Sequence, residues 1–280
     1  MDAVGPIPQS AGQATLGEVI AEARRLLEQA GIESAGQEAF WIMEHVLRLP
    51  AHHAVADRDR LLSDAELLAA RGLVERRVGR EPLQYILGTQ EFCGLEFNVN
   101  PAVLIPRPET ELLVRYVAQR IPAERQATIV DVCTGSGCIA VAIARLRPCA
   151  RVLATDLSNR SLDVARQNAT RHEVCERITW LEGDLLRPLA EQELEGRIDV
   201  IVSNPPYIAE ADWAMLQPEV WLFEPRGALV AGPQGTELHE RLLHESGRYL
   251  IPGGAVIMEI GAGQARALRR IVDQMSGYRF

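Results

Sequence analysis

The chain has 280 residues, of which 47% are hydrophobic and 24% charged, with 29 basic and 38 acidic side chains and a formal net charge of −9. This length allows one large domain, or a large domain with a small one, and the hydrophobic fraction excludes wholesale disorder. No window approaches 18 uninterrupted apolar residues, so we expect neither a transmembrane helix nor a membrane partner. An acidic chain is a poor general binder of polyanions, so we expect no direct nucleic-acid partner.

The five cysteines form no C-x-x-C pair and the histidines lack zinc-site spacing, so no metal is expected. Residues 1–12 are rich in Gly, Pro, Ser and Gln and are predicted to be a loose leader. They lack the basic and apolar regions of a secretion signal. Together with the odd number of cysteines, this predicts reduced thiols and a cytoplasmic location.

Three helical patterns predict a small bundle in the first 80 residues. Apolar residues recur at three- and four-residue spacing from Thr15 to a stop at Gly31. A second helix is predicted from about Gln37 to Leu49, ahead of Pro50. A third begins at the capping box Ser63-Asp64-Ala65-Glu66 and runs to about Val78.

The segment from Pro82 to Pro108 differs in character. Aromatic and β-branched residues are interrupted by Gly and Pro, which predicts a β-hairpin; the runs concerned are Tyr85-Ile86-Leu87-Gly88, Phe92-Cys93-Gly94 and Phe97-Asn98-Val99. A helix is predicted to follow, through about Arg120.

Strand and helix patterns alternate through the rest of the chain. The predicted strands are Thr128–Val132, Arg151–Ala154, Ile178–Leu181, Ile198–Val202 and Ala255–Ile260, and the helices between them are Ile139–Leu146, Ser161–Thr170 and Thr236–Leu250. Such alternation predicts an α/β fold, with a parallel sheet and helices on both faces. We therefore expect a helical domain over 1–80, a hairpin linker over 81–108 and a sheet domain over 109–280.

A glycine-rich turn follows the first of these strands, in the sequence Asp131-Val132-Cys133-Thr134-Gly135-Ser136-Gly137-Cys138. Glycines allow the backbone to approach a ligand closely, and the helix that follows offers free N–H groups. With Ala140 in the last position, the turn also matches a permitted form of the dinucleotide fingerprint, and a plain strand–helix turn stays an alternative.

The next two strands each end in a carboxylate. Asp156 can accept hydrogen bonds from a ribose diol, or it can help to cap the following helix together with Ser158. Asp184 can accept from the exocyclic amine of an adenine, while Leu185 lies on the ring; a simple Gly-Asp turn is the alternative. Ligands of such sheets bind outside the carboxyl ends of the strands, which favours a shared role.

The motif Asn204-Pro205-Pro206-Tyr207 follows the strand Ile198–Val202. The prolines fix the backbone and remove two N–H donors, so nearby carbonyls are available to a ligand. Asn204 can both donate and accept, and Tyr207 supplies a flat face. The set suits a planar group bearing NH₂, because the amide oxygen of Asn204 and the carbonyl of Pro205 can each accept one N–H.

In this order the segments resemble class I S-adenosylmethionine-dependent methyltransferases that modify amino groups. The resemblance narrows to the HemK-type protein-(glutamine-N5) methyltransferases, which modify the Gly-Gly-Gln glutamine of class I peptide chain release factors. It rests on Phe92-Cys93-Gly94, on Val103-Leu104-Ile105-Pro106-Arg107-Pro108-Glu109-Thr110-Glu111, on Glu224-Pro225 with Ala228-Leu229, and on Glu259-Ile260-Gly261 with Gln264.

The resemblance implies a Rossmann-like methyltransferase sheet, S-adenosyl-L-methionine as cofactor and a release factor as protein substrate, recognised by the N-terminal helical domain. It implies that Cys133, Thr134, Gly135, Ser136 and Gly137 wrap the methionine part of the cofactor. Further implied roles are ribose binding by Asp156, an adenine border from Asp184 and Leu185, and a substrate clamp from Asn204, Pro205, Pro206 and Tyr207, with Asn204 also beside the cofactor. We favour a monomer.

Two departures from the family pattern keep alternatives open. Cys133 stands where the release-factor enzymes usually have glycine, and with Phe92-Cys93-Gly94 it resembles the related enzyme that methylates a glutamine of a large-subunit ribosomal protein. Pro106-Arg107-Pro108-Glu109-Thr110-Glu111 favours the release-factor branch. The chain ends at Phe280 near the start of a predicted strand, whereas the family continues with another, so we expect an incomplete sheet edge.

Three other functions compete with this assignment. A nucleic-acid methyltransferase acting on an exocyclic amine would use the same clamp, but it usually needs a basic, aromatic surface to extract the base. Residues 1–95 carry nine arginines and 14 acidic residues, a net charge of −5, which disfavours it. A non-catalytic binding module would have no use for the intact clamp, and a dehydrogenase would have no role for it in hydride transfer.

Overall fold

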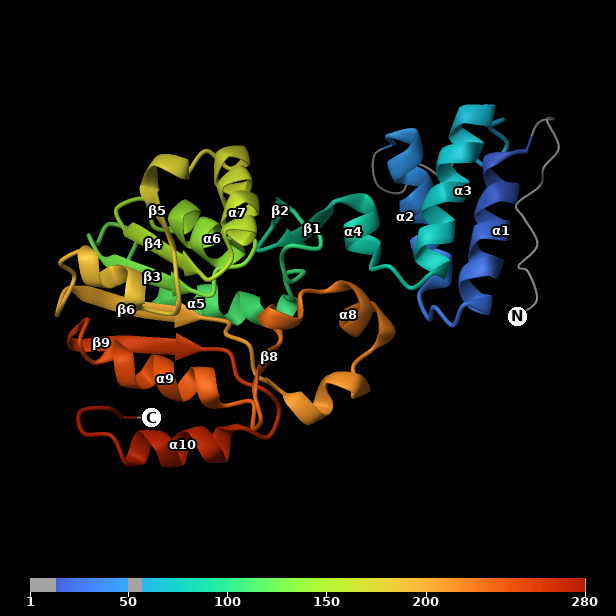
Figure 1. Ribbon diagram of the computed structural model, residues 1–280. Helices are drawn as coiled ribbons and strands as arrows, with labels where there is room; N and C mark the ends of the chain where they lie inside the picture. Colours follow the sequence, from blue (N-terminus) through green and yellow to red (C-terminus); the bar gives the residue numbers. More distant parts are fainter. Residues whose placement is uncertain (1–13, 50–56, 280) are drawn as a thin grey trace. The chain divides into compact units, whose positions relative to one another are not determined.

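The computed structural model describes residues 14–49 and 57–279. The chain forms two compact units that divide between Gly88 and Thr89 (Figure 1). The predicted leader at 1–12 lies outside the described residues. None of the helices in the described parts is long and apolar enough to cross a bilayer.

The first unit is a bundle of α1 (Leu16–Gln29), α2 (Ala35–Leu47) and α3 (Asp64–Val78), with the short α4 (Leu83–Leu87). Capping boxes begin α1 at Thr15 and α3 at Ser63, the latter as predicted: each hydroxyl accepts from the backbone of the third helical residue, whose Glu reaches back. The apolar faces meet in one core, which includes Leu16, Ala23, Leu27, Ile42, Met43 and Val74.

A buried ion pair joins α2 to α3. Arg77 Nε lies 2.6 Å from Glu38 Oε2, and both side chains are more than 90% buried. The Ser34 hydroxyl donates to the other oxygen, Glu38 Oε1, at 2.7 Å. Each buried charge needs the opposite charge of its partner, because separating them would leave an uncompensated charge in the core. The pair therefore fixes how the two helices are aligned.

One element of the predicted hairpin is wrong. Tyr85, Ile86 and Leu87 belong to α4, which starts after Pro82 and ends at Gly88 in a left-handed conformation, with φ of 79°. Leu83 joins the bundle core, and this tertiary packing outweighs the β propensity of the sequence. The hairpin itself consists of β1 (Thr89–Phe92) and β2 (Leu95–Asn98), which pair antiparallel.

The second unit contains a five-stranded sheet in the order β5-β4-β3-β6-β9, and every pair in it is parallel. Its strands are β3 (Thr128–Val132), β4 (Arg151–Asp156), β5 (Ile178–Glu182), β6 (Ile198–Ser203) and β9 (Leu250–Met258). Its main helices are α5 (Glu111–Arg120), α6 (Cys138–Leu146), α7 (Asn159–Arg171), α9 (Glu237–Ser246) and α10 (Ala265–Asp273). Between β6 and α9 lie β7 (Ile208–Ala209), α8 (Pro218–Phe223) and β8 (Val230–Gly232).

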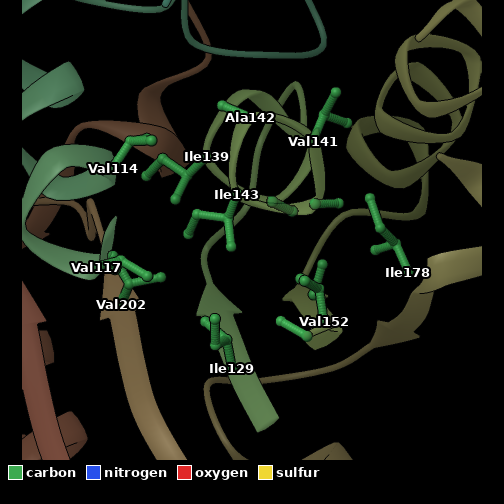
Figure 2. Packing of buried hydrophobic residues seen from close by; sticks show 14 of the residues in the cluster. Val114, Val117, Ile129, Ile139, Val141, Ala142, Ile143, Val152, Ile178 and Val202 are labelled. Atoms are coloured by element: carbon green, nitrogen blue, oxygen red, sulfur yellow. The ribbon is translucent and has the colours of Figure 1, made fainter. Parts of the chain in front are cut away.

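Both faces of this sheet are covered, as the alternating pattern predicted. On β3, Ile129 faces the cluster formed with α5 and α6, while Val130 and Val132 face the cluster that includes Leu242 of α9. Figure 2 shows α6 packing over β3, β4 and β6, with Ile143 pointing to the strands and Ile139 lying beside Val114 of α5. The predicted parallel α/β fold is therefore confirmed.

The bounds of the last predicted helix and of the last predicted strand differ from those in the structure. The helix α9 ends at Ser246 rather than near Leu250, because Leu250 already pairs with Ile198 of β6. The strand β9 runs from Leu250 to Met258 rather than from Ala255 to Ile260, and it passes through Gly253 and Gly254, which gave no strand signal. Among the described residues, β6 is the only strand that pairs with β9, so β9 forms one edge of the sheet.

We predict that Glu38→Ala destabilises the first unit by about 3 kcal/mol, because it leaves the Arg77 guanidinium buried without its carboxylate. Chemical denaturation of the full chain, monitored through the unfolding transition of the helical bundle, measures this loss in the free energy of unfolding. The double variant Glu38→Leu with Arg77→Met is the control and should recover most of the stability. Equal losses in the single and double variants would show that shape, and not charge, links the helices.

Candidate active site

The candidate site lies where β4, β3 and β6 end side by side. In the sheet register, Val132 at the end of β3 lies between Thr155 of β4 and Ser203 of β6. The strand order reverses between β3 and β6: β4 and β5 lie on one side of β3, and β6 and β9 lie on the other. Parallel sheets bind ligands in the crevice at such a switch point.

The glycine-rich turn leaves β3 in an alternating backbone conformation. Cys133, Gly135 and Gly137 all have positive φ, of 59°, 56° and 79°. A Cβ on Gly135 would have no heavy atom within 4 Å, whereas one on Gly137 would lie 2.9 Å from Ala165 Cβ. Gly135 therefore borders open space, and Gly137 allows the turn to pack against α7.

Asp131 anchors this turn from inside the sheet. Its Oδ2 accepts from the Thr134 hydroxyl at 2.5 Å and from the backbone N–H of Ala140, in the first turn of α6, at 3.1 Å. Its Oδ1 is buried without a hydrogen-bond partner, as is the hydroxyl of Ser136. Burial raises the pKa of Asp131 to about 7, and the nearby Asp156 carboxylate adds to this rise.

Asp156 connects the end of β4 to the turn. Its Oδ2 accepts from the N–H of Gly135 and its Oδ1 from the N–H of Ser158, each at 2.9 Å. Ser158 is the N-cap of α7, so the capping interpretation also describes this segment. Burial raises the pKa of Asp156. These carboxylate oxygens can accept from hydroxyl groups, and a ligand with positive charge would relieve the crowding of the two acids. Both features fit a cationic cofactor with hydroxyl groups, such as S-adenosylmethionine.

The third predicted cofactor segment has partners inside the protein. Asp184 Oδ2 accepts from Arg241 Nη2 of α9 at 2.7 Å, and the Arg187 guanidinium lies 3.7 Å from the same oxygen. Leu185 is buried in the core, with a positive φ of 50°. This geometry holds the loop after β5 against α9 and leaves Asp184 Oδ1 as the oxygen available to a ligand.

The diproline corner follows β6 directly. Pro205 and Pro206 are buried, whereas Asn204 and Tyr207 are half-buried. The N–H groups of Tyr207 and Ile208 both donate to the carbonyl of Leu229, at 3.1 and 2.8 Å, which fastens the end of the corner to the segment before β8. The corner is therefore rigid, with the side chains of Asn204 and Tyr207 at the edge of the core.

Two residues that sequence reasoning left without a role hold these side chains. Asn204 Nδ2 donates to Thr110 Oγ1 at 3.0 Å, and the Thr110 hydroxyl donates to Glu259 Oε2 at 2.6 Å. The Tyr207 hydroxyl donates to Glu259 Oε1 at 3.3 Å. Burial, followed by the Glu259 charge, raises the pKa of Tyr207 to about 12, so its hydroxyl keeps its proton at neutral pH.

Other residues of the resemblance motifs make hydrogen bonds to the corner or to each other. Arg107 Nη2 donates to the buried Glu224 Oε1 at 2.6 Å. Gln264 Nε2 donates to the carbonyls of Tyr207 and Gly235, at 2.9 and 3.1 Å. The motifs had marked these residues, but their roles depend on contacts between distant parts of the chain.

Asn168 of α7 carried no sequence signal. Its fully buried amide donates to the carbonyl of Ser136 at 2.9 Å and to that of Asn98 at 3.0 Å, and it accepts from the N–H of Asn98 at 2.7 Å. The glycine-rich turn and the end of β2 are thus joined through one side chain.

Comparisons with known proteins agree with this geometry. Residues 18–88 match the family described as PrmC N-terminal domain, and residues 108–231 match the family described as methyltransferase small domain. A release factor glutamine methyltransferase of Geobacter sulfurreducens is 44% identical over 91% of this chain and 87% of its own length. The chain belongs to the release factor glutamine methyltransferase family. The enzyme of that name from Moorella thermoacetica is 38% identical over 95% of this chain and 92% of its own.

A solved structure supports the fold of this family member. The hMettl16 catalytic domain in complex with a 3′UTR hairpin is 17% identical, with a TM-score of 0.50 over 77% of this chain and 76% of that one. This likeness is a likeness of fold only.

We predict that alanine at the two glycines of the turn has different effects. Gly135→Ala costs about 1–2 kcal/mol for the left-handed backbone but creates no clash within the protein, and its methyl group enters the space open to a ligand. Gly137→Ala adds a clash with Ala165 to that strain. We therefore expect the larger fall in Tm for Gly137→Ala, and a loss of S-adenosylmethionine affinity beyond the stability loss for Gly135→Ala. Thermal unfolding and calorimetric titration measure the two, and equal behaviour of both variants contradicts the prediction.

Proposed function

We propose that this chain transfers a methyl group from S-adenosylmethionine to the side-chain amide nitrogen of the glutamine in the Gly-Gly-Gln motif of class I peptide chain release factors. One observation carries the proposal: the rigid corner Asn204-Pro205-Pro206-Tyr207 stands next to the glycine-rich turn, in a chain whose curated relatives are named release factor glutamine methyltransferases. Translation factors act in the cytoplasm, and we propose that location for this enzyme.

The cofactor supplies an activated methyl group on a sulfonium centre when it is bound. We propose that the backbone from Cys133 to Gly137 holds its methionine part and that Asp156 holds the ribose hydroxyls. Asp184 Oδ1 and Leu185 would border the adenine. The support is the open space at Gly135, the unpartnered Oδ1 of Asp131, and two buried acids that a cation would relieve.

The substrate amide requires positioning because its nitrogen lone pair is delocalised into the carbonyl. We propose that Asn204 Oδ1 and the Pro205 carbonyl each accept one N–H of the glutamine side chain. Two acceptors fix the plane of the NH₂ group and turn its lone pair toward the methyl group, in a near-attack geometry. They also stabilise the positive charge that develops on nitrogen. The proton leaves after transfer, so no strong base is needed beforehand. Pro206 keeps the corner rigid and Tyr207 supplies a flat wall.

We also propose a division of labour along the chain. Residues 1–80 would recognise the protein substrate, 81–108 would connect, and 109–280 would carry out methyl transfer. The separate family match at 18–88 supports a dedicated function for the helical unit. We favour a monomer, and the net charge of −9 supports a protein substrate over a nucleic acid.

Two related substrates compete with this proposal. A glutamine of a large-subunit ribosomal protein would fit the same corner, and so would the exocyclic amine of a base. The names of the relatives favour the release factor. Incubation with labelled S-adenosylmethionine and all three substrates, followed by mass spectrometry, separates them. Label at the Gly-Gly-Gln glutamine supports the proposal, and label confined to the ribosomal protein or to DNA refutes it.

We predict that Asn204→Ala lowers kcat by roughly 100-fold or more, because one of the two acceptors for the substrate amide is lost. Affinity for S-adenosylmethionine should change little. Initial rates and calorimetric titration measure these effects. Asn159→Ala, in the first turn of α7, is the matched control and should keep full activity. Turnover near the normal rate in Asn204→Ala would show that this side chain does not hold the substrate.

A further inference from the structure

We propose that Thr110 and Glu259 are positioning residues that decide which end of the Asn204 amide faces the substrate, and that they thereby let the enzyme distinguish glutamine from glutamate. The inference rests on the proposed function and deepens it. It comes from the chain of contacts that runs from Asn204 through the Thr110 hydroxyl to the Glu259 carboxylate, with distances of 3.0 and 2.6 Å.

The direction of these hydrogen bonds follows from their chemistry. An ionised carboxylate can only accept, so the single hydrogen of the Thr110 hydroxyl is committed to Glu259. Thr110 Oγ1 can then only accept from Asn204, which requires that Nδ2 faces Thr110. The amide oxygen of Asn204 must therefore point away from Thr110. A carboxylate two contacts away sets the orientation of an amide whose two ends have nearly the same shape.

Glu259 itself is held in place at several points. Its N–H donates to the carbonyl of Ser203 at 3.0 Å, beside the corner, and its carbonyl accepts from His239 Nε2 at 2.8 Å. Because a carbonyl oxygen can only accept, Nε2 is the donor in this contact, and burial lowers the pKa of the His239 ring. The second carboxylate oxygen accepts from Tyr207. One acid thus orients both functional side chains of the corner, and Thr110, which is 2% exposed, has little freedom to turn.

The fixed amide has a consequence for specificity. An oxygen acceptor attracts the NH₂ of a glutamine side chain, but it repels the carboxylate of glutamate. If the amide could rotate by half a turn, its NH₂ would bind glutamate well and oppose glutamine. Discrimination between these two side chains then depends on Thr110 and Glu259, although neither needs to touch the substrate.

The test uses the full chain with a class I release factor and with the same factor carrying glutamate in place of the Gly-Gly-Gln glutamine. The quantities measured are kcat and KM for the first and the inhibition constant of the second. In Thr110→Val, which has nearly the same shape, we expect kcat to fall at least tenfold. We also expect the preference for glutamine over glutamate to fall about tenfold, which corresponds to one hydrogen bond. The affinity for S-adenosylmethionine should stay within twofold.

Three further variants separate positioning from folding. Thr110→Ser keeps the hydroxyl and should restore both kcat and the preference. Glu259→Gln should give a partial loss, because a neutral amide can either donate to Thr110 or accept from it. Thr170→Val, at an exposed site on α7 where the hydroxyl donates to its own helix, is the matched control and should be normal.

Loss of activity with an unchanged preference would overturn the proposal, because it would indicate a purely structural role. Unchanged kcat in Thr110→Val would overturn it as well. Failure of the normal enzyme to methylate the release factor would instead refute the proposed function, and that measurement is made first. If Thr110→Val unfolds, the comparison of Glu259→Gln with Thr110→Ser decides between the same outcomes.

Discussion

The parallel alignment of β4, β3 and β6 is the constraint on which the candidate site depends. Parallel strands place their carboxyl ends at one edge, and the register brings Val132, Thr155 and Ser203 side by side. The acid at the end of β4, the turn after β3 and the corner after β6 therefore lie at the same edge of the sheet. Helices on both faces keep that alignment, since each strand contributes alternate side chains to two separate clusters.

Three buried acidic side chains lie in or near the candidate site. Asp131, Asp156 and Glu224 are all buried enough to raise their pKa values, which is costly in the free protein. Glu224 is compensated by Arg107. The two acids at the glycine-rich turn would gain from a cofactor that carries positive charge, which agrees with the proposed binding of S-adenosylmethionine there.

Much of this arrangement could be predicted from the sequence because its signals are local. A strand followed by glycines, or by two prolines, can be recognised from a few neighbouring residues. The start of α3 could likewise be predicted from the capping box at Ser63. The limits appear where contacts join distant segments. Thr110 and Glu259 are 149 residues apart, and Arg241 reaches Asp184 across 57. Tyr85 shows the other limit, because it lies in α4, and the packing of Leu83 from that helix in the bundle core outweighs the strand propensity of the segment.

Asn168 also sets a limit on how this part of the molecule can change. The NH₂ group of its amide donates to the carbonyls of Ser136 and Asn98, and the amide oxygen accepts from the N–H of Asn98. All of these hydrogen-bonding groups are therefore already in use. The hairpin and the glycine-rich turn are therefore coupled through this one side chain. An insertion at the end of β2 would therefore disturb the backbone at Ser136 as well as the hairpin itself.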